Sequence, residues 1–581
     1  MAKIVQIEER TTATAPDGEL IKVHLKTWIV LLAINIVSFA QITAIVGSGF
    51  LASGIAKVVG GADKTLWFSQ TINVLTIAVA LPVSQMADYW GRKWILVVLT
   101  LLGCIGAILV SRAQGVGTVI AGFTLVGMNV GAQPILYAVA SEILPRRQRG
   151  WALTTLNMSV SFGGLIALLM GGALLDGGKV ENFRVFFYVV IGFYAVAFLG
   201  CLLFYNPPPR ELEVSLTFQE KLRKLDWLGY ALFTPGLTLF SVALSWSQNP
   251  YSWSDVHILA TFVIGVVMVI AFGVYEWRFK KDGIMHHDLF KNRNFVIALV
   301  AVWVDGLSFF TANTYFAMQY SIFKGARLLL SASAFSMLFI IGGTASILFG
   351  LYVAKFKSVK IPGIIGLGLI VLFNVLMATT TPSTPAANYW GYAVFAGLGL
   401  GSVIPTFMLA AQMSTPPDLI SLASGLDIVA RPIGGVIGLA VNTAIFNSAM
   451  SKEVPARIAA ATIPLGLPTS SLGDLIHALT TNDIAALATI SGATPGIIQA
   501  AGGALMGAYH IAFRNCWIAA ALLCVPGVIV ACFLIEFKGE FKAHIDAPVE
   551  AELVEIQKQL ETYHDENAGG SAEKQSENLA A

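Results

Sequence analysis

The stretch Trp94-Ile-Leu-Val-Val-Leu-Thr-Leu-Leu-Gly-Cys-Ile-Gly-Ala-Ile-Leu-Val-Ser111 is an uncharged apolar run that directly follows the basic pair Arg92-Lys93. An α-helix rises about 1.5 Å per residue, so a run of this length crosses most of the roughly 30 Å hydrocarbon core of a bilayer. The run therefore predicts a membrane-spanning helix whose basic end lies at the membrane surface.

Runs of this kind fill the whole chain of 581 residues. Hydrophobic residues make up 56% of the sequence and charged residues 12%, and the mean hydropathy is +0.73. A soluble domain of this size is not expected to have such a composition. We therefore predict an all-α polytopic membrane protein. Its fourteen predicted spans lie near residues 28–51, 65–86, 94–111, 118–140, 152–175, 184–204, 228–247, 257–277, 295–317, 331–354, 361–380, 389–411, 421–447 and 513–536.

Lysine and arginine collect in every second gap between these spans. The positive-inside rule predicts that this basic side faces the cytoplasm, together with both termini. Residues 448–512 then form one long outer loop, which we expect to contain short surface helices. The basic gaps hold Arg92 and Lys93; Arg146, Arg147 and Arg149; Arg210, Lys221, Arg223 and Lys224; Arg278, Lys280, Lys281, Lys291 and Arg293; and Lys355, Lys357 and Lys360.

Other features argue against catalysis and nucleic-acid binding. The net charge is only +2, and the sequence has no GxxxxGK[ST] phosphate-binding loop. The five cysteines include no CxxC pair, and His286-His287-Asp288 lacks an accompanying set of metal ligands. We therefore expect no enzyme activity, no cofactor, no metal site and no nucleic-acid partner.

The two ends of the chain resemble each other at a nearly constant offset. Residues 161–168, SFGGLIAL, are similar to residues 432–439, PIGGVIGL. The other matching landmarks are Gly127, Gly131, Pro134 and Pro145 and, 270 or 271 positions later, Gly397, Gly401, Pro405 and Pro416. We infer two parallel six-helix repeats with a substrate path on the axis between them. Close packing of glycine-rich helices would produce a similar spacing without a repeat.

This repeat divides the chain into seven segments, with two inserted helices between the repeats. The predicted segments are 1–27, a cytoplasmic N-terminal segment; 28–204, an N-terminal six-helix bundle; 205–227, a cytoplasmic linker; 228–277, two inserted transmembrane helices; 278–294, a cytoplasmic basic loop; 295–536, a C-terminal six-helix bundle that includes the extracellular loop 448–512; and 537–581, a cytoplasmic tail.

The loop Ser84-Gln-Met-Ala-Asp-Tyr-Trp-Gly-Arg-Lys93 lies between spans two and three. It resembles the signature loop of the major facilitator superfamily, G-x-L-A-D-R-x-G-R-K. An aspartate at a helix end can accept bonds from a neighbouring helix and pair with arginine, which locks one conformation. Membrane anchoring by the basic residues alone is the alternative. The predicted gating residues are Asp88, Gly91, Arg92, Lys93 and Glu142.

Span thirteen, Gly425-Leu-Asp-Ile-Val-Ala-Arg-Pro-Ile-Gly-Gly-Val-Ile-Gly438, carries a narrower resemblance. It is similar to the matching span of fourteen-helix drug:proton antiporters, most of all to fungal trichothecene-efflux-type pumps, and siderophore transporters share much of it. The resemblance implies two six-helix bundles, two added helices and exchange of substrate for protons. The chain departs from that pattern because residues 35–49 contain no acid, Phe123 replaces an expected arginine and Leu168 an expected proline.

Asp305, in the middle of span nine, is the leading candidate for proton coupling. A charge deep in a bilayer costs about 2.5–3.5 kcal/mol on insertion scales, so its presence indicates a function. The counterpart of Asp305 at the repeat offset is Asn35, so the acid appears in the second half only. Asp305 is then expected to bind and release a proton as access alternates. The alternative is an acid neutralised by a fixed partner.

Asp427 and Arg431 lie four positions apart in span thirteen and share a helix face. We predict an intramembrane ion pair between them, with contact of Arg431 to an anionic substrate as the alternative. Polar and aromatic residues of the spans are candidates for a substrate cavity; the alternative for each is a contact between helices. They are Gln41, Asn73, Asn129, Gln133, Trp303, Phe309, Phe310, Asn313, Tyr315 and Gln319.

Together these features predict a proton-coupled secondary active transporter that exports toxins, drugs or secondary metabolites across the plasma membrane by alternating access. The vacuolar membrane is the alternative location. The expected partners are a small amphipathic substrate, protons and the lipid bilayer, and the chain is expected to be a monomer. A siderophore-iron importer is the nearest alternative function, and a non-transporting membrane sensor is the second.

Overall fold

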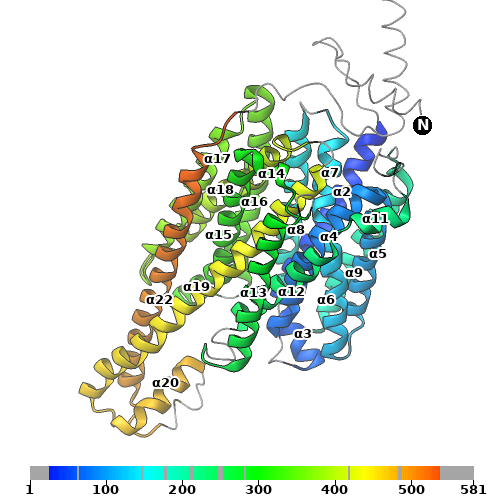
Figure 1. Ribbon diagram of the computed structural model, residues 1–581. Coiled ribbons are helices and arrows are strands. Elements are labelled where there is room, and N and C mark those ends of the chain that lie inside the picture. Colours follow the sequence, from blue (N-terminus) through cyan, green and yellow to red (C-terminus); the bar gives the residue numbers. More distant parts are fainter. Residues whose placement is uncertain are drawn as a thin grey trace, which may run out of the picture.

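The computed structural model describes residues 25–536 except 62–64, 146–147, 176–179, 208–212, 214, 216, 247–252, 281–282, 327, 417–418, 482–486 and 488–489. Within these described residues every regular element is a helix (Figure 1). The helices are α2 (Leu25–Phe50), α3 (Ala52–Val59), α4 (Thr65–Trp90), α5 (Arg92–Ser111), α6 (Val116–Val130), α7 (Gln133–Glu142), α8 (Arg149–Leu175), η4 (Val180–Asn182), α9 (Phe183–Phe204), α11 (Phe218–Lys224), α12 (Trp227–Trp246), α13 (Val256–Arg278), α14 (His287–Lys291), α15 (Arg293–Lys324), α16 (Leu328–Phe356), α17 (Lys360–Ala378), α18 (Ala386–Met413), α19 (Ile420–Thr462), η6 (Ile463–Leu465), η7 (Thr469–Ser471), α20 (Leu472–Thr481) and α22 (Pro495–Ala531).

Fourteen segments of the described chain are long and apolar enough to cross a membrane, and each coincides with one of the fourteen predicted spans. The predicted all-α polytopic fold class is therefore confirmed. The fourth span consists of two helices, because α6 ends before Gly131 and α7 starts at Gln133. Pro134 follows this break and has no N–H to donate, so it favours the start of a new helix.

The last two spans differ most from the prediction. α19 continues to Thr462 rather than ending near 447, and α22 starts at Pro495 rather than near 513. A helix of 43 residues is about 65 Å long, roughly twice the hydrocarbon thickness, so α19 projects beyond the membrane. The predicted outer loop 448–512 is therefore mainly a helical hairpin, with the short helix α20 near its tip (Figure 1).

Apolar side chains at helical spacing hold the two arms of this hairpin together. Val454 and Ile458 of α19 form a small buried cluster with Ile497, Ala501 and Ala508 of α22. On the exposed side of α19, the basic residue Arg457 pairs with Glu453 one turn earlier. This amphipathic pattern explains why both helices continue beyond the membrane. We call residues 448–512 the hairpin and this end of the molecule the hairpin end.

The membrane helices form two groups that lie side by side (Figure 1). One group contains α2–α9 and the other α15–α22, with α12 and α13 at the junction between them. α8 and α16 pack along their length, since Gly172 faces Leu329 near the hairpin end and Gly350 faces Thr154 near the opposite end. Helix α12 contacts both α4 and α19, and so it bridges the two groups.

Some predicted features lie outside the described residues. These are residues 1–24 of the N-terminal segment, the tail 537–581, and the basic residues Arg146, Arg147, Arg210 and Lys281.

Candidate functional site

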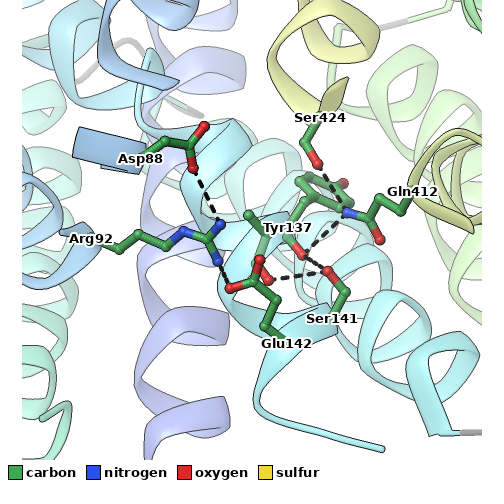
Figure 2. A network of polar contacts seen from close by, with 8 residues as sticks. Asp88, Arg92, Tyr137, Ser141, Glu142, Gln412 and Ser424 are labelled. Atoms are coloured by element: carbon green, nitrogen blue, oxygen red, sulfur yellow. Dashed lines mark hydrogen bonds and ion pairs between the residues drawn. The ribbon is translucent and has the colours of Figure 1, made fainter. Parts of the chain in front are cut away.

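The loop between α4 and α5 begins a buried polar network (Figure 2). α4 ends at Trp90 and α5 starts at Arg92, and Gly91 between them has a φ of +82°, which favours glycine. This turn places the Arg92 guanidinium between Asp88, 3.4 Å from Nη2 to Oδ1, and Glu142 at the end of α7. Asp88, Arg92 and Glu142 are 5%, 3% and 2% exposed. We call them the Arg92 triad and this end of the molecule the triad end.

The remaining predicted gating residue, Lys93, points elsewhere. Its ammonium group donates a hydrogen bond to the Asn206 side-chain oxygen just after α9, and it lies over the ring of Trp94. Lys93 therefore ties the start of α5 to the end of α9 within one helix group and does not join the triad.

Hydrogen bonds beside the triad link the two helix groups (Figure 2). Gln412 of α18 donates from Nε2 to the Tyr137 carbonyl oxygen of α7 at 3.4 Å and to Ser424 Oγ of α19 at 2.9 Å. The next residue, Gly425, packs so closely on α4 that a Cβ there would lie 2.5 Å from Ser84 Oγ. The two groups are thus in contact at the triad end.

We expect Glu142→Gln to loosen this contact. The change removes one of the two negative charges beside the buried Arg92, and breaking a buried ion pair by removing one partner typically costs about 3–5 kcal/mol. A cysteine placed at the buried Ser424, in a background without the native cysteines, should then react faster with a membrane-impermeant maleimide supplied at the triad end. Lys224→Gln, which neutralises an exposed residue of α11, is the control. Equal labelling of the two variants would contradict the predicted gating role.

Asp305 lies where α15 packs against α19. Its side chain is 0% exposed, and Oδ2 accepts a hydrogen bond from Arg431 Nε at 2.7 Å. The guanidinium carbon of Arg431 lies 4.4 Å from the centre of the Phe309 ring, which adds a cation–π contact. The Arg431 side chain is 21% exposed, so the pair joins a fully buried acid to a base that is partly exposed.

Glycines bring α15 and α19 close enough for this pair. A Cβ on Gly306 would lie 1.9 Å from the Arg431 carbonyl oxygen, and a Cβ on Gly434 would lie 1.9 Å from the Trp303 carbonyl oxygen. Contacts this close between backbones require residues without a side chain. The Asp305–Arg431 pair therefore depends on the glycines next to it as well as on its own charges.

The structure corrects the predicted pairing of Asp427 with Arg431. Arg431 pairs across the helix contact with Asp305, while Asp427 is 1% exposed and neither carboxylate oxygen has a hydrogen-bond partner among the described residues. Helical spacing puts Asp427 and Arg431 on one face of α19, but the close approach of α15 brings Asp305 into contact with Arg431. Asp427 lies near enough to Asp305 for their charges to interact. We call Asp305, Asp427 and Arg431 the acid–base cluster.

Tyr137, which the sequence analysis missed, connects this cluster to the triad end. It lies within electrostatic reach of all three cluster members, and its carbonyl oxygen accepts the hydrogen bond from Gln412. Tyr137 and Gln412 do not stand out in the sequence, since neither residue type is unusual in an apolar helix. The available signal was their position in the repeat, because Tyr137 follows the landmark Pro134 and Gln412 follows the landmark Pro405.

The first helix group has an uncharged arrangement at the corresponding place. Asn35 of α2, the counterpart of Asp305, accepts a hydrogen bond from Ser159 Oγ of α8 at 2.8 Å and donates to Thr155 Oγ1 at 3.3 Å. The first and fifth membrane spans of each group, α2 with α8 and α15 with α19, are therefore joined by polar contacts. The contact between α15 and α19 is formed by charged side chains.

Several of the ten predicted cavity residues form contacts between helices. Gln41 donates to the carbonyl oxygen of Asn129 at 2.8 Å, and Gln319 contacts Thr380 and Trp517, so these residues are contacts between helices. Of the others, Trp303, Phe309 and Phe310 lie at the α15–α19 contact, Tyr315 hydrogen-bonds Thr443, Asn73 and Gln133 are half-buried, and Asn313 is exposed.

Two adjoining open cavities lie along α19 from Ile437 to Glu453, so that the second one reaches into the hairpin. One has a volume of about 410 Å³ and an apolar lining from α12, α13, α19 and Trp253, which precedes α13. The other has a volume of about 480 Å³ and a more polar lining from α19 and α22. Ala444 and Ile445 line both. None of the ten predicted residues lines either cavity. The distinctive lining residues are Phe240, Trp253 and Phe262 in the first and Ser448, Lys452 and Glu453 in the second.

Fourteen membrane helices in two groups, joined at the triad end, define the class of a multi-pass membrane transporter. Residues 31–439 match the family model described as Major Facilitator Superfamily, and the chain belongs to that superfamily. The resemblance noted in the sequence is thereby confirmed.

The proteins similar in sequence include fungal transporters. The chain is 26% identical over 410 residues to an MFS-type transporter of Penicillium citrinum, covering 69% of this chain and 68% of the relative. It is 22% identical over 454 residues to the efflux pump FUS6 of Gibberella fujikuroi, covering 77% and 80%. Among solved structures, the human organic anion transporter MFSD10 aligns with a TM-score of 0.50 at 12% identity, covering 87% of this chain and 99% of that one. At this identity the similarity is one of fold alone.

Proposed function

We propose that this chain exports a small amphipathic molecule across the plasma membrane in exchange for protons, with the triad end in the cytoplasm. The acid–base cluster carries the proposal. Asp305 pairs with the guanidinium of Arg431, while the second buried acid, Asp427, lies near Asp305 and has no hydrogen-bond partner of its own among the described residues. With all three groups ionised, one negative charge is uncompensated in a buried site, which is costly. Uptake of one proton balances the cluster, and release of the proton unbalances it.

α19 is the element through which a proton would affect transport. Protonation of Asp305 weakens its attraction for Arg431, because a neutral acid no longer has a Coulomb interaction with the guanidinium. Arg431 lies on the helix that also carries Ser424 and Gly425 at the triad end and lines both cavities. A shift of α19 therefore changes the contact at the Arg92 triad, to which we assign gating, and the shape of the cavities together, as alternating access requires.

The two cavities favour an amphipathic substrate. Phe240, Trp253 and Phe262 offer an apolar surface at one end, while Lys452 and Glu453 offer charges at the other. Volumes of this size are typical for drug-sized ligands. Export is supported by the similar proteins that carry the name efflux pump.

Transport into sealed proteoliposomes with an imposed pH gradient tests this function. We expect an amphipathic drug-like substrate to move against its own concentration gradient in exchange for protons, and a protonophore to abolish that movement. A ferric hydroxamate tested in parallel distinguishes the siderophore-import alternative, since its uphill movement without drug transport would overturn export. Movement of neither compound would favour the sensor alternative.

A further inference from the structure

A second pair of buried acids lies away from the acid–base cluster, where α12 and α13 meet at the triad end. Asp226 directly precedes α12 and is 1% exposed, and Glu276 lies near the end of α13 and is 2% exposed. The two carboxyl groups lie within hydrogen-bonding reach of each other, and the buried Asp226 Oδ2 has no hydrogen-bond donor among the described residues. Within the described part of the chain, neither acid forms an ion pair with lysine or arginine.

The chemistry of this contact requires a proton. An ionised carboxylate has only hydrogen-bond acceptors, so two ionised carboxylates cannot bond to each other and instead repel. A hydrogen bond between them therefore needs one acid in its protonated form. We propose that Asp226 and Glu276 share one proton and form a proton-dependent latch that joins α12 to α13 and thereby holds α12 in its place against the gating helix α4.

Glu276 is the part of the latch that holds the loop after α13. Its carboxyl oxygens accept hydrogen bonds from the N–H groups of Ile284 and Met285, each at 3.1 Å. Gly283 packs so closely that a Cβ there would lie 2.4 Å from Glu276 Oε2. His287 Nε2 donates to the Glu276 carbonyl oxygen at 3.0 Å, so the imidazole bonds the backbone rather than the acid.

Asp226 is the part that connects to α4. Its Oδ1 accepts hydrogen bonds from the Gly229 N–H and the Tyr275 hydroxyl, both at 3.0 Å. Tyr230, one turn into α12, donates its hydroxyl to the side-chain oxygen of Gln85, which lies three residues before Asp88 on α4. A displacement of the start of α12 is thus passed directly to the helix that carries the Arg92 triad.

Other ionisable side chains lie around the two carboxyl groups. The titratable side chains that face the pair are Tyr230 of α12, Tyr275 of α13 and His287 of α14, while Asp88 and Tyr89 of α4 lie beyond Tyr230. Loss of the shared proton leaves two negative charges in a buried contact. The latch is therefore closed in acid, and it opens as the pH on the triad side rises.

Infrared spectroscopy on the full-length protein in lipid tests the shared proton. At neutral pH the wild type should show the C=O stretch of a protonated carboxyl group, and Glu276→Gln and Asp226→Asn should each remove the same part of that band. Glu220→Gln is the matched control on α11. Hydrogen bonds from Thr217 lower the pKa of the exposed Glu220, so this residue should be ionised and contribute nothing to the band.

Amide hydrogen exchange of residues 283–287 tests the latch itself. After correction for the intrinsic rate, exchange in the wild type should rise by up to about tenfold per pH unit, the slope expected when one proton leaves on opening. Both variants should lose this dependence, and Asp226→Asn serves if Glu276→Gln does not fold. An unchanged infrared band in both variants, or wild-type pH dependence in a variant, would overturn the proposal.

Discussion

Asp305→Asn is expected to abolish uphill transport driven by a pH gradient. Asparagine keeps the size and a hydrogen bond toward Arg431 but cannot bind and release a proton, so the coupling step is lost. The change also leaves a guanidinium without its charged partner, which typically costs about 3–5 kcal/mol, and the melting temperature should fall. Both effects are measured on purified protein, the first by uptake into proteoliposomes and the second by thermal unfolding.

A double variant separates these two effects. Asp305→Asn with Arg431→Gln removes both charges, so stability should recover toward the wild type while gradient-driven transport stays absent. Asp427→Asn alone is the comparison, because it neutralises an acid of the same cluster and leaves the Asp305–Arg431 bond in place. If Asp305→Asn folds normally and keeps full gradient-driven transport, the pair is structural and Asp305 is not the coupling acid.

Gly306→Ala and Gly434→Ala are expected to destabilise the protein strongly. Each new Cβ would lie 1.9 Å from a backbone carbonyl oxygen of the facing helix, and a backbone cannot move aside as a side chain can. Overpacking typically costs about 1–3 kcal/mol and occasionally more. Separation of α15 from α19 should also break the Asp305–Arg431 pair, so transport should fall together with thermal stability.

Gly368→Ala and Gly391→Ala are the matched controls for this prediction. Both glycines lie inside long helices, α17 and α18, where an added Cβ would meet nothing within 4 Å. Alanine is favoured over glycine in a helix by up to about 1 kcal/mol, so these controls should be neutral or slightly stabilising. Equal melting temperatures for Gly306→Ala and Gly391→Ala would show that the backbone contact does not exist.

Fourteen spans are predictable from the sequence because the hydrophobicity of a membrane helix is a local property. The arms of the hairpin are not visible in the same way. Their apolar positions, such as Val454 and Ile458, recur one turn apart among alanines and charged residues, which lowers the mean hydropathy of residues 448–512. The helical periodicity of those positions was the signal that would have extended both helices.

The site is less predictable because its chemistry depends on contacts between distant segments. Asp305 is identified by its isolation in an apolar span, but its partner follows from the approach of α15 to α19 at Gly306 and Gly434. The cavities depend on where α12 and α13 pack, which no local pattern encodes. Glu276 looks like an ordinary charge at the end of its span until the facing Asp226 is known.

The hairpin makes α19 a lever. From Gly434, at the contact with α15, to Thr462 the helix rises about 42 Å, so a tilt of about 10° at that contact moves the far end by about 7 Å. Small rearrangements around a buried proton site are thereby enlarged into a displacement outside the membrane. An antibody fragment that holds the hairpin is expected to arrest the transport cycle without approaching the substrate, and a dye attached there would report each turnover.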